Sequence, residues 1–451
     1  MIESLISIVF CLSSALTVLI LLLPSQYDPA TQKGKPSVQI LVLGDIGRSP
    51  RMQYHALSIA NHGGKVVIIG YKESDPHPDI VSHRNITIVP LRPHPAILQT
   101  SNKLLFTIYG PLKVLFQIAY LWKCLAYTVT PSRWLLVQNP PSIPTLAIAS
   151  LSSFLRQTRL VIDWHNFGYS LLALKLGHNH PLVKLSIWYE TTLCRSASAH
   201  LCVTDAMGSV LKKKFELQAP IFCLHDRPAS HFRPINNPDE RIEFLNTLPE
   251  TKPVRAPLTE GRLRVLVSST SWTPDEDFSV LIDALLQYSE LATAKPALPE
   301  VLAIITGKGP QKEMYLQKIA ALEAAGRLGK VTIRTAWLSV PDYAQLLASA
   351  SLGVSLHTSS SGVDLPMKVV DMFGAGLPVV GWNRFEAWPE LVTEGVNGMG
   401  FGSSTELTER LTELFGDNKR LETLRAGAQN ESIRRWDNEW DPIMGKLLGL
   451  T

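Results

Sequence analysis

Residues 359–383 read SSSGVDLPMKVVDMFGAGLPVVGWN and contain one strand-to-helix junction of an α/β sheet. A polar run, Ser359 to Gly362, precedes Pro366, and proline favours the first turn of a helix. An apolar stretch with helical spacing follows and contains Asp371. A Gly-x-Gly stop then leads into the strand-like run 377–380. The order loop, helix, strand predicts one repeat of a parallel sheet with helical crossovers.

The same pattern extends outward from this junction in both directions. Apolar, strand-like runs separated by helical patterns occur in the second half at 262–270, 300–306, 330–337 and 351–356. The first half repeats the pattern at 37–43, 65–71, 86–91, 134–139, 158–164, 199–203 and 220–224. The sequence therefore predicts an α/β protein of GT-B type, with two Rossmann-like domains facing an interdomain cleft.

The domain boundaries follow from shifts in composition. Residues 231–260 are polar and rich in proline, which predicts a linker. The predicted segments are a membrane anchor at 1–24, an N-terminal domain at 36–230, the linker at 231–260, a C-terminal domain at 261–425 and a helical segment at 426–451.

The bulk composition excludes several classes of protein. With 451 residues and 45% hydrophobic content, the chain is globular and long enough for about two to three domains. The net charge of +4 is too weak to indicate nucleic-acid binding. The five cysteines show no zinc-site spacing, which favours free thiols in a reducing compartment.

The N-terminus is apolar from residue 2 to residue 23, with Glu3 as its one charge. About twenty such residues suffice to span a bilayer, so we expect an uncleaved single-pass transmembrane helix. Basic residues follow the segment and none precedes it, which places the rest of the chain in the cytosol. A cleaved signal peptide is the alternative, and the cysteine pattern weighs against it.

A second apolar region covers residues 104–128. Lys113 and Lys123 interrupt it, and Pro111 breaks its helical pattern. It could be a second transmembrane helix, a helix lying in the membrane interface, or a buried helix.

Three loops at strand ends of the second half predict a nucleotide-diphosphate site. Free N–H groups at a helix N-terminus favour a phosphate, and Lys368 adds a charge in the first turn. Asp371, one turn on, could accept hydrogen bonds from a ribose. An ordinary capped strand-to-helix turn would produce the same pattern. The expected donor-binding residues are Ser269, Thr270, Ser271, Lys308, Ser360, Ser361, Gly362, Lys368 and Asp371.

The acidic run 275–277 resembles an Asp-x-Asp metal site, but it follows a proline at a helix start. We therefore expect no metal ligand there, and no metal or other cofactor in the protein.

In the first half, the loop 44–49 resembles a degraded dinucleotide-binding turn. The acid expected at the end of the next strand is missing, which argues against a dinucleotide. Two residues are candidates for a catalytic base: Asp45, and His165, whose side-chain type suits proton transfer near neutral pH. The acceptor-side candidates are Gly44, Gly47, Arg48, Asp163 and Asn166. A hydrogen-bonded structural histidine remains the alternative for His165.

Longer motifs point to a family. The stretches LGDIGRSPRMQYHALSIA, DWHNFGYS, VTDAM, HDRP, SSTSWTPDEDF and SGVDLPMKVVDMFGAGLPV resemble the chitobiosyldiphosphodolichol β-mannosyltransferases, a dolichol-pathway family of GT-B glycosyltransferases. The resemblance covers nearly the whole chain. Two features depart from many retaining GT-B enzymes: Val363 stands where the first acid of a Glu-x7-Glu pair would be, and the loop 268–278 lacks an Arg/Lys pair.

The resemblance implies a reaction and a location. Mannose would pass from GDP-mannose to dolichyl-diphosphate chitobiose with a β-1,4 linkage, which requires one inversion. The enzyme would be an endoplasmic reticulum membrane protein with its catalytic part on the cytosolic face. Its partners would be both substrates, membrane lipids and other early dolichol-pathway transferases.

Two other functions compete with this one. A different GDP-mannose-dependent transferase of the pathway should carry the Glu-x7-Glu pair, which is absent here. An inactive GT-B scaffold should have lost the charged residues at its strand ends, which are present.

Overall fold

The computed structural model describes residues 2–30, 34–95, 103–273 and 276–451. The chain divides into two compact units. The N-terminal unit contains residues 1–202, 210–222 and 440–451, and the C-terminal unit contains residues 203–209 and 223–439.

The N-terminal unit is built on a seven-stranded sheet with the order β3-β2-β1-β4-β5-β6-β7. The strand pairs from β3 to β6 are parallel. The strands are β1 (Ser37–Asp45), β2 (Lys65–Tyr71), β3 (Ile86–Pro90), β4 (Trp134–Asn139), β5 (Arg159–Trp164), β6 (Ala199–Cys202) and β7 (Ile221–Cys223). β1 is buried over most of its length, as expected of a central strand covered on both faces.

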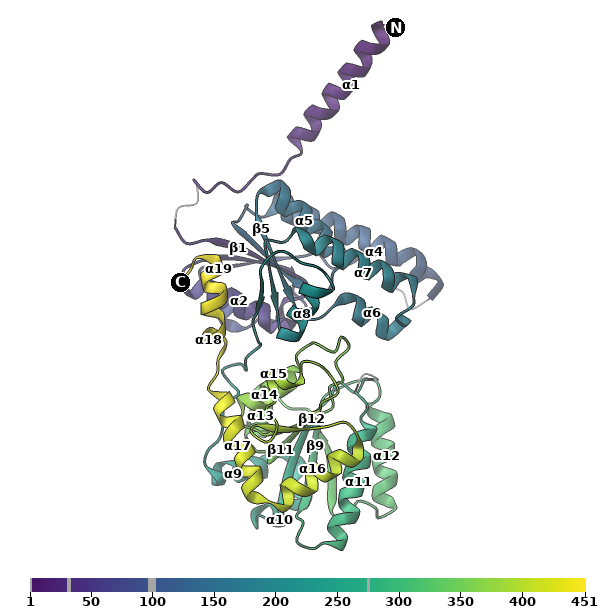
Figure 1. Cartoon of the computed structure of the whole chain (residues 1–451), viewed down its shortest axis with the longest axis vertical. Helices are drawn as coiled ribbons and strands as arrows, with labels where there is room; N and C mark the ends of the chain where they lie inside the picture. The colour runs from purple at the N-terminus through teal and green to yellow at the C-terminus, as the bar shows by residue number, and fades with distance from the viewer. Residues whose placement is uncertain (1, 31–33, 96–102, 274–275) are drawn as a thin grey trace. The chain divides into compact units, whose positions relative to one another are not determined.

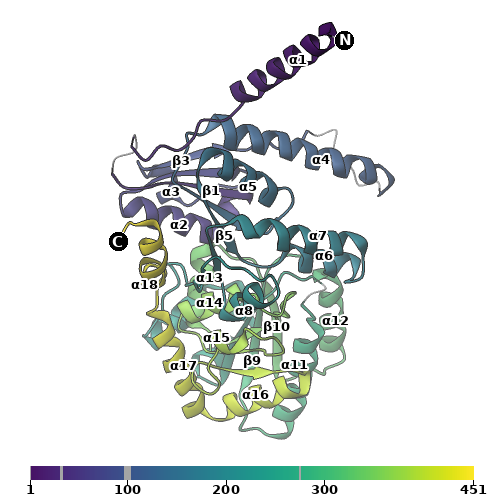
Figure 2. The same cartoon turned by 45° about the horizontal axis from the view of Figure 1, so that its top comes forward.

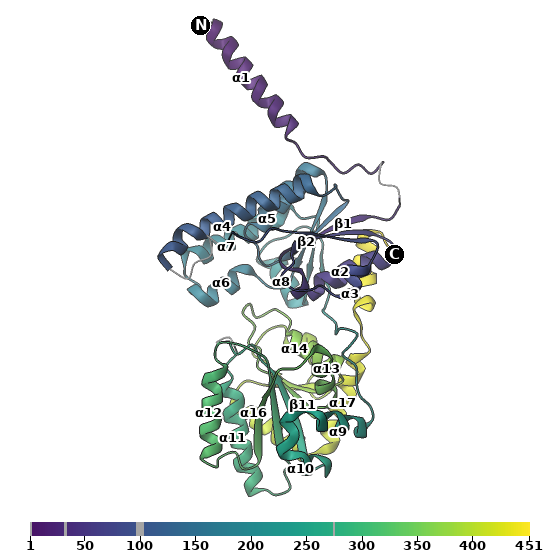
Figure 3. The same cartoon turned by 180° about the vertical axis from the view of Figure 1, so that it is seen from behind.

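Helices cover both faces of this sheet (Figures 1 and 3). On one face lie α2 (Pro50–Asn61) and α3 (Pro78–Ser82). On the other lie α4 (Lys103–Lys123), its π-helical continuation η3 (Cys124–Thr128), α5 (Thr145–Arg156) and α7 (Pro181–Leu193). The remaining elements are η1 (Ile46–Arg48), α6 (Gly168–Leu176), η4 (Cys194–Ser196) and α8 (Asp205–Lys213).

The C-terminal unit has a six-stranded sheet with the order β10-β9-β8-β11-β12-β13, and all its pairs are parallel. The strands are β8 (Leu263–Ser269), β9 (Glu300–Thr306), β10 (Val331–Ala336), β11 (Leu352–Ser355), β12 (Val379–Trp382) and β13 (Gly398–Phe401). Trp272, Phe278 and Tyr288 are fully buried in its core.

Helices also surround the second sheet, as Figure 2 shows. They are α9 (Pro238–Thr247), η5 (Pro249–Val254), α10 (Arg255–Thr259), α11 (Ser279–Ala294), α12 (Lys312–Ala324), α13 (Val340–Ser349), α14 (Met367–Gly374), α15 (Trp388–Leu391), α16 (Ser404–Gly416) and α17 (Asn418–Ser432). The chain ends in α18 (Trp436–Trp440), η6 (Asp441–Gly445) and α19 (Lys446–Leu448).

Both sheets have a topological switch point, where ligands of open α/β sheets bind. In the first sheet the strand order reverses between β1 and β4, and in the second between β8 and β11. The prediction of two parallel, doubly wound sheets is confirmed. The carboxyl ends of β1, β4 and β5, and of β8 and β11, are therefore the places to examine for function.

The division into units differs from the predicted boundaries. Most of the predicted linker 231–260 forms α9, η5 and α10, because Leu245, Leu248 and Leu258 are buried in the C-terminal unit. Residues 440–451, expected to belong to a separate helical segment with 426–439, pack in the N-terminal unit. Strand β13 was not predicted, since the short run 398–401 contains two glycines and gives no strand signal.

Both apolar regions singled out in the sequence form helices. Residues 2–21 form α1 (Ile2–Leu21), and most of 104–128 forms α4 and η3, with Pro111 inside α4. Across the residues that the structure describes, no helix combines the length and the apolar character needed to cross a bilayer. The predicted transmembrane span at 1–24 is therefore not confirmed.

Candidate functional site

A buried carboxylate organises the carboxyl end of β5. Asp163 is fully buried and accepts two hydrogen bonds from Arg51, whose Nε and Nη2 lie 2.8 and 2.9 Å from its two oxygens. The Nε2 atoms of His55 and His165 lie 3.2 and 3.0 Å from Asp163 Oδ2. Burial alone would raise the pKa of Asp163, but the charge of Arg51, with the two histidines, holds this pKa well below its ordinary value.

The ionised state of Asp163 determines which ring nitrogen of His165 carries a proton. An ionised carboxylate only accepts hydrogen bonds, so Nε2 of His165 must carry a proton. In the neutral imidazole, Nδ1 is then the basic nitrogen. The His165 side chain is 25% exposed, whereas Asp163 is completely covered. A partly exposed imidazole held by a buried carboxylate is the arrangement of a general base and the group that orients it.

His55 supports this pair from the other side. Its Nδ1 lies 2.9 Å from Nε1 of Trp440, and an indole N–H can only donate. His55 therefore accepts at Nδ1 and donates from Nε2 to Asp163, which makes it neutral. Burial lowers its pKa in agreement with this state. A hydrogen-bonded chain thus runs from Trp440 through His55 and Asp163 to His165.

The second base candidate, Asp45, is a loop-capping residue in this structure. Its carboxylate accepts hydrogen bonds from the Ser74 hydroxyl and from the backbone N–H groups of Gly47, Glu73 and Ser74. Desolvation would raise the pKa of Asp45, but these hydrogen bonds, led by the Ser74 hydroxyl, lower it. A carboxylate that already accepts four hydrogen bonds and has a lowered pKa is a weak base.

The other candidates in the loop after β1 lie around the capping carboxylate of Asp45. A side chain at Gly47 would collide with Ser74 and the backbone of Asp75, so glycine allows the two loops to touch. Gly44 lies within β1, where the pairing with β2 is irregular between Val42 and Asp45. Arg48 is 81% exposed and lies 3.5 Å from Asp45.

Glu190 holds the loop that follows His165. This fully buried side chain accepts hydrogen bonds from the Ser142 hydroxyl and from the N–H groups of Gly168 and Tyr169, at the start of α6. Asn166 caps the same turn, since its Oδ1 accepts from the N–H of Phe167 at 2.7 Å. Burial raises the pKa of Glu190 to about 7, because these hydrogen bonds only partly compensate for desolvation.

The raised pKa of Glu190 makes a testable prediction about stability. Its ordinary value is 4.5, so the folded state retains the proton as pH rises from 4.5 to about 7. The contribution of Glu190 to stability is then largest below pH 4.5 and falls through this window by about 3 kcal/mol. Glu190→Gln should flatten this part of the stability curve, measured by urea denaturation at pH 5 and pH 8. Glu216→Gln, at an exposed site, is the matched control; equal slopes in both variants would contradict the assignment.

Asn139 was not identified from the sequence. It ends β4 at the first switch point, is fully buried, and neither atom of its side-chain amide has a hydrogen-bond partner in the described part of the chain. The backbone carbonyl oxygen of Asn139 accepts a hydrogen bond from the backbone N–H of His165 at 2.9 Å. An unpaired amide is costly inside a protein, and this one lies directly behind the loop that carries His165. The only signal in the sequence is its position before two prolines.

In the C-terminal unit, Asp364 stabilises the loop after β11 through hydrogen bonds. Its carboxylate accepts hydrogen bonds from His357 Nε2 at 2.9 Å, Ser361 Oγ at 3.0 Å and the Ser359 hydroxyl. Burial raises the pKa of Asp364, but the hydrogen bond from His357 and the two hydroxyls outweigh this and lower it. Ser360 and Gly362 lie in the same loop, and Gly362 has a φ of 78°, which favours glycine.

Glu276 stabilises the loop after β8 in the same way, by accepting hydrogen bonds from its residues. Its Oε2 accepts from the Thr270 hydroxyl at 2.6 Å and from the Ser271 N–H at 2.8 Å. Its Oε1 pairs with Lys368 Nζ, from the first turn of α14. The structure therefore brings Thr270, Ser271 and Lys368 together at the second switch point. Glu276, which the sequence suggested only as a helix-start acid, is the residue that joins them.

Asp371 lies one turn further along α14 and has no clear base or cap role. Burial and the charge of Asp226 raise its pKa to about 7. The nearby Tyr343 hydroxyl lies 2.8 Å from Ser269 Oγ, which also lies 3.1 Å from Thr306 Oγ1. Tyr343 therefore links Ser269, at the end of β8, with Asp371, because burial and the charge of Asp371 together raise the pKa of the Tyr343 hydroxyl.

The glycines at 307 and 309 serve loop packing. A Cβ atom at Gly307 would overlap the carbonyl oxygen of Thr270, and one at Gly309 would overlap that of Ser271. The loops after β8 and β9 can touch only because these positions lack side chains. Lys308, between them, does not point at Glu276: its Nζ lies 3.9 Å from the ring centroid of Trp337, a cation–π contact.

Gly309→Ala should therefore destabilise the C-terminal unit. We expect its free energy of unfolding to fall by about 2–4 kcal/mol, because backbone must move to relieve the overlap. Gly329→Ala is the matched control, since nothing lies within 4 Å of a Cβ there. The measurement is denaturant unfolding of the full chain; equal midpoints for the two variants would contradict the close packing.

One cluster in the described residues has the donor atoms of a metal site. Asp205, Cys223, His225 and Glu390 place one ligand atom each within 4.8 Å of one another. Two of these side chains already bond to each other or to backbone: Glu390 accepts from the N–H groups of Asp205 and Ala206 and from His225 Nε2. The hydrogen bonds to Cys223 and Glu390 raise the pKa of His225 to about 10. A charged His225 would not bind a metal ion.

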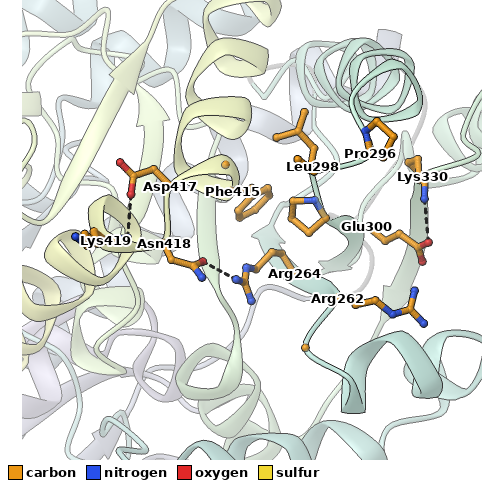
Figure 4. Close-up of a pocket in the computed structure, with 14 residues that line it drawn as sticks. Arg262, Arg264, Pro296, Leu298, Glu300, Lys330, Phe415, Asp417, Asn418 and Lys419 are labelled. Carbon is orange, nitrogen blue, oxygen red and sulfur yellow. Dashed lines mark hydrogen bonds and ion pairs between the residues drawn. The ribbon is translucent and has the colours of Figure 1, made fainter.

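A pocket of about 530 Å³ lies at the opposite edge of the second sheet (Figure 4). It is lined by residues at the amino ends of β8 and β9, including Arg264 and Glu300. Arg264 donates to Asn418, and Lys330 pairs with Glu300. Because ligands of open α/β sheets bind at the carboxyl ends of strands, we do not assign this pocket to catalysis.

Comparisons with known proteins identify a matching family model and a solved structure with the same fold. Residues 262–417 match the family model of glycosyl transferases group 1. Sucrose-phosphate synthase from Thermosynechococcus elongatus has the same fold, with a TM-score of 0.63 over 92% of this chain and 98% of that one, at 13% identity.

Curated relatives are much more similar in sequence. The chitobiosyldiphosphodolichol beta-mannosyltransferase of Arthroderma benhamiae is 51% identical, covering 98% of each chain. The UDP-glycosyltransferase TURAN of Arabidopsis thaliana is 41% identical, covering 91% of this chain and 96% of its own. At such identity over nearly the full length, the chain belongs to the family of the chitobiosyldiphosphodolichol beta-mannosyltransferases.

Proposed function

We propose that this protein transfers mannose from GDP-mannose to dolichyl-diphosphate chitobiose, forming a β-1,4 linkage. The family membership supports the substrates. The Asp163–His165 pair is the single structural observation that carries the proposal, because it supplies a base in the unit expected to bind the acceptor. The sugar is α-linked in the donor and β-linked in the product. The reaction is then a single displacement with inversion.

His165 is proposed as the catalytic base. Its Nδ1 would take the proton of the acceptor hydroxyl as that oxygen attacks the anomeric carbon, and Asp163 would stabilise the resulting imidazolium. Asn139 would help to hold His165 in place, since its backbone carbonyl oxygen accepts the His165 N–H. Asp45 and Arg48 would shape the neighbouring loop, with Gly44, Gly47 and Asn166 serving backbone geometry.

The C-terminal unit is proposed to bind the donor. The departing GDP carries negative charge that must be stabilised as the bond to mannose breaks. Lys368 and the loop with Ser360, Ser361 and Gly362 would meet the diphosphate. Asp371 would accept hydrogen bonds from the ribose, and Ser269, Thr270, Ser271 and Lys308 would line the remainder of the donor site.

We further propose that these groups suffice without a metal ion. Lys368 is held beside the α14 N-terminus by Glu276, so a positive charge and free N–H groups converge at one place. The enzyme would associate with the endoplasmic reticulum membrane through α1, with both units in the cytosol. The described large apolar side chains of α1, among them Phe10 and Leu12, are exposed, which supports this placement. Association with other early dolichol-pathway transferases is part of the same proposal.

The experiment is mannosyl transfer by the full-length chain to phytanyl-diphosphate chitobiose in detergent. GDP-mannose should give a product that β-mannosidase removes, and EDTA should not reduce its yield. UDP-sugars should give none; transfer from a UDP-sugar would favour the activity named for the Arabidopsis relative. Absence of product from folded protein with any donor would favour an inactive scaffold.

A further inference from the structure

A pocket of about 350 Å³ lies in the C-terminal unit next to the pocket of Figure 4, and both are lined by Arg264. Its walls are formed by residues of α9, α10, β8 and α17 and by the end of α13. Leu263 begins β8 and Ser351 directly precedes β11, so this pocket lies at the amino ends of these strands. The proposed donor residues lie at the carboxyl ends, at the opposite edge of the same sheet. We call this separate cavity the arginine pocket.

The arginine pocket is strongly basic for its size. Its charged lining residues are Arg241, Arg264, Arg425 and Glu422. Three guanidinium groups thus face one carboxylate, and the side chain of Glu422 is 68% exposed and well solvated. Burial, together with the like charges of Arg241 and Arg264, lowers the pKa of Arg425 to about 10. The pocket therefore concentrates positive charge that its own residues do not neutralise.

Arg425 is buried without the partners that a buried guanidinium normally has. It is 6% exposed, and its Nη2 donates to the backbone carbonyl oxygens of Ala350 and Ser351 at 3.0 and 3.2 Å. Its Nε has no hydrogen-bond partner among the residues that the structure describes. Glu422 Oε1 lies 3.7 Å from this Nε, too far for a hydrogen bond. Because buried polar groups are almost always hydrogen-bonded, the unpaired Nε marks a place for a ligand atom.

Two more buried donors line the same pocket. Nε of Arg264 and the hydroxyl of Ser349 also have no hydrogen-bond partner in the described part of the chain. Arg264 is held in place by Asn418, whose Oδ1 accepts from Nη2 at 2.6 Å (Figure 4). A guanidinium group can only donate hydrogen bonds, and a hydroxyl can donate one. The ligand that satisfies these groups must therefore present acceptor oxygens.

The charge and the walls of the pocket indicate which anion fits. A phosphate monoester carries a charge of about −1.5 to −2 at pH 7 and offers three acceptor oxygens, which suits several arginines together. A carboxylate carries a single negative charge and leaves more of the positive charge uncompensated. Leu245, Leu258 and Leu421 line the same pocket and suit an apolar organic group. The volume is at the small end of the range for ligand pockets, so the ligand is small.

We propose that the arginine pocket binds a small phosphate monoester. Its phosphate would contact Arg264, Arg425 and Ser349, and its organic group would contact the leucines. This site goes beyond the proposed reaction, since it lies at the other edge of the sheet from the proposed donor residues and its occupation requires no turnover.

The test is calorimetric titration of the full-length chain in detergent with phenyl phosphate. This probe combines a phosphate dianion with an apolar ring. We expect saturable binding, about tenfold weaker binding of inorganic phosphate because the ring contacts are lost, and no binding of phenol. Absence of saturable binding of phenyl phosphate, or equal binding of phenol, would overturn the proposal.

Two variants test the groups that would hold the phosphate. Ser349→Ala removes a buried hydroxyl without a partner, so the unfolding midpoint of the ligand-free protein should not fall, while phenyl phosphate should bind about fivefold more weakly. Arg264→Gln should weaken binding about tenfold or more through loss of a charged donor. Arg327→Gln is the matched control, since Arg327 is an exposed arginine of the same unit, paired with Glu290. Binding that is unchanged in both Ser349→Ala and Arg264→Gln would contradict the assignment.

Two further variants locate the bound phosphate. Lys368→Ala removes the cation of the proposed donor site, and Lys330→Gln removes a cation of the pocket in Figure 4. Both should bind phenyl phosphate as the wild type does. Loss of binding in either variant, with full binding in Ser349→Ala, would place the anion outside the arginine pocket and overturn the proposal. The outcome is independent of the proposed reaction, because no measurement depends on mannosyl transfer.

Discussion

His165→Ala is expected to lower kcat for mannosyl transfer by roughly 10²–10⁴-fold, the usual contribution of a positioned base. The structure gives the reason: His165 is the partly exposed end of a hydrogen-bonded chain whose buried member is the ionised Asp163. Removing the imidazole leaves the acceptor hydroxyl without a group to take its proton. Binding of GDP should be unchanged, because the proposed donor residues all belong to the C-terminal unit. Initial rates and GDP titration by calorimetry measure the two quantities.

The control for this prediction is His178→Ala, since His178 is an exposed histidine of the same unit. Asp45→Ala provides the comparison with the other base candidate. It should weaken the loop after β1 and lower thermal stability while retaining substantial kcat. If Asp45→Ala abolished turnover in folded protein and His165→Ala did not, the roles assigned to the two residues would be reversed.

Lys368→Ala is expected to lower kcat/KM by roughly 10²–10³-fold through loss of charge beside the departing diphosphate. It should also weaken GDP binding, unlike the His165 variant. Lys368→Arg retains the charge and should recover part of the activity, although the compact ammonium and the planar guanidinium are not equivalent. Steady-state kinetics with varied GDP-mannose, together with GDP titration, distinguish this pattern from a loss of the base.

Lys318→Ala is the matched control, because Lys318 is also ion-paired, with Asp283, on the surface of the same unit. Glu276→Gln tests the support of Lys368 separately. It removes the partner charge but leaves the lysine, so a moderate loss of activity with retained GDP binding is expected. Wild-type activity in Lys368→Ala would exclude this lysine from the donor site.

Much of the fold could be predicted from the sequence because buried parallel strands are continuous apolar runs. The run 65–71 coincides with β2, and Lys368 lies in the first turn of α14 as expected. The sequence also predicts which residues lie at the ligand-binding edge, since polar residues that follow a buried strand lie at the carboxyl edge of a parallel sheet. His165, Asp163, Thr270 and Lys368 were found in this way.

The partners of those residues could not be predicted, because they come from distant parts of the chain. Nothing near Asp163 indicates that Arg51 and His55 donate to it, and spacing alone does not separate Asp45 as a cap from Asp45 as a base. Lys308 was expected to bind the donor, whereas the glycines on either side of it, Gly307 and Gly309, allow two loops to touch. Residues 231–260 appeared to be a linker because prolines mark helix starts as well as irregular chain.

The return of the last twelve residues to the N-terminal unit has a consequence for inherited and engineered truncations. Trp440 donates to His55, and Lys35 Nζ donates to the carbonyl oxygen of Leu450 at 2.8 Å. A premature stop codon just before position 440 would spare the unit proposed to bind the donor yet remove the indole that fixes the tautomer of His55. Under the proposed mechanism, the damage would fall on acceptor activation by His165, which is encoded far upstream. Expression of the first domain alone would likewise require this C-terminal peptide, supplied as a graft or in trans.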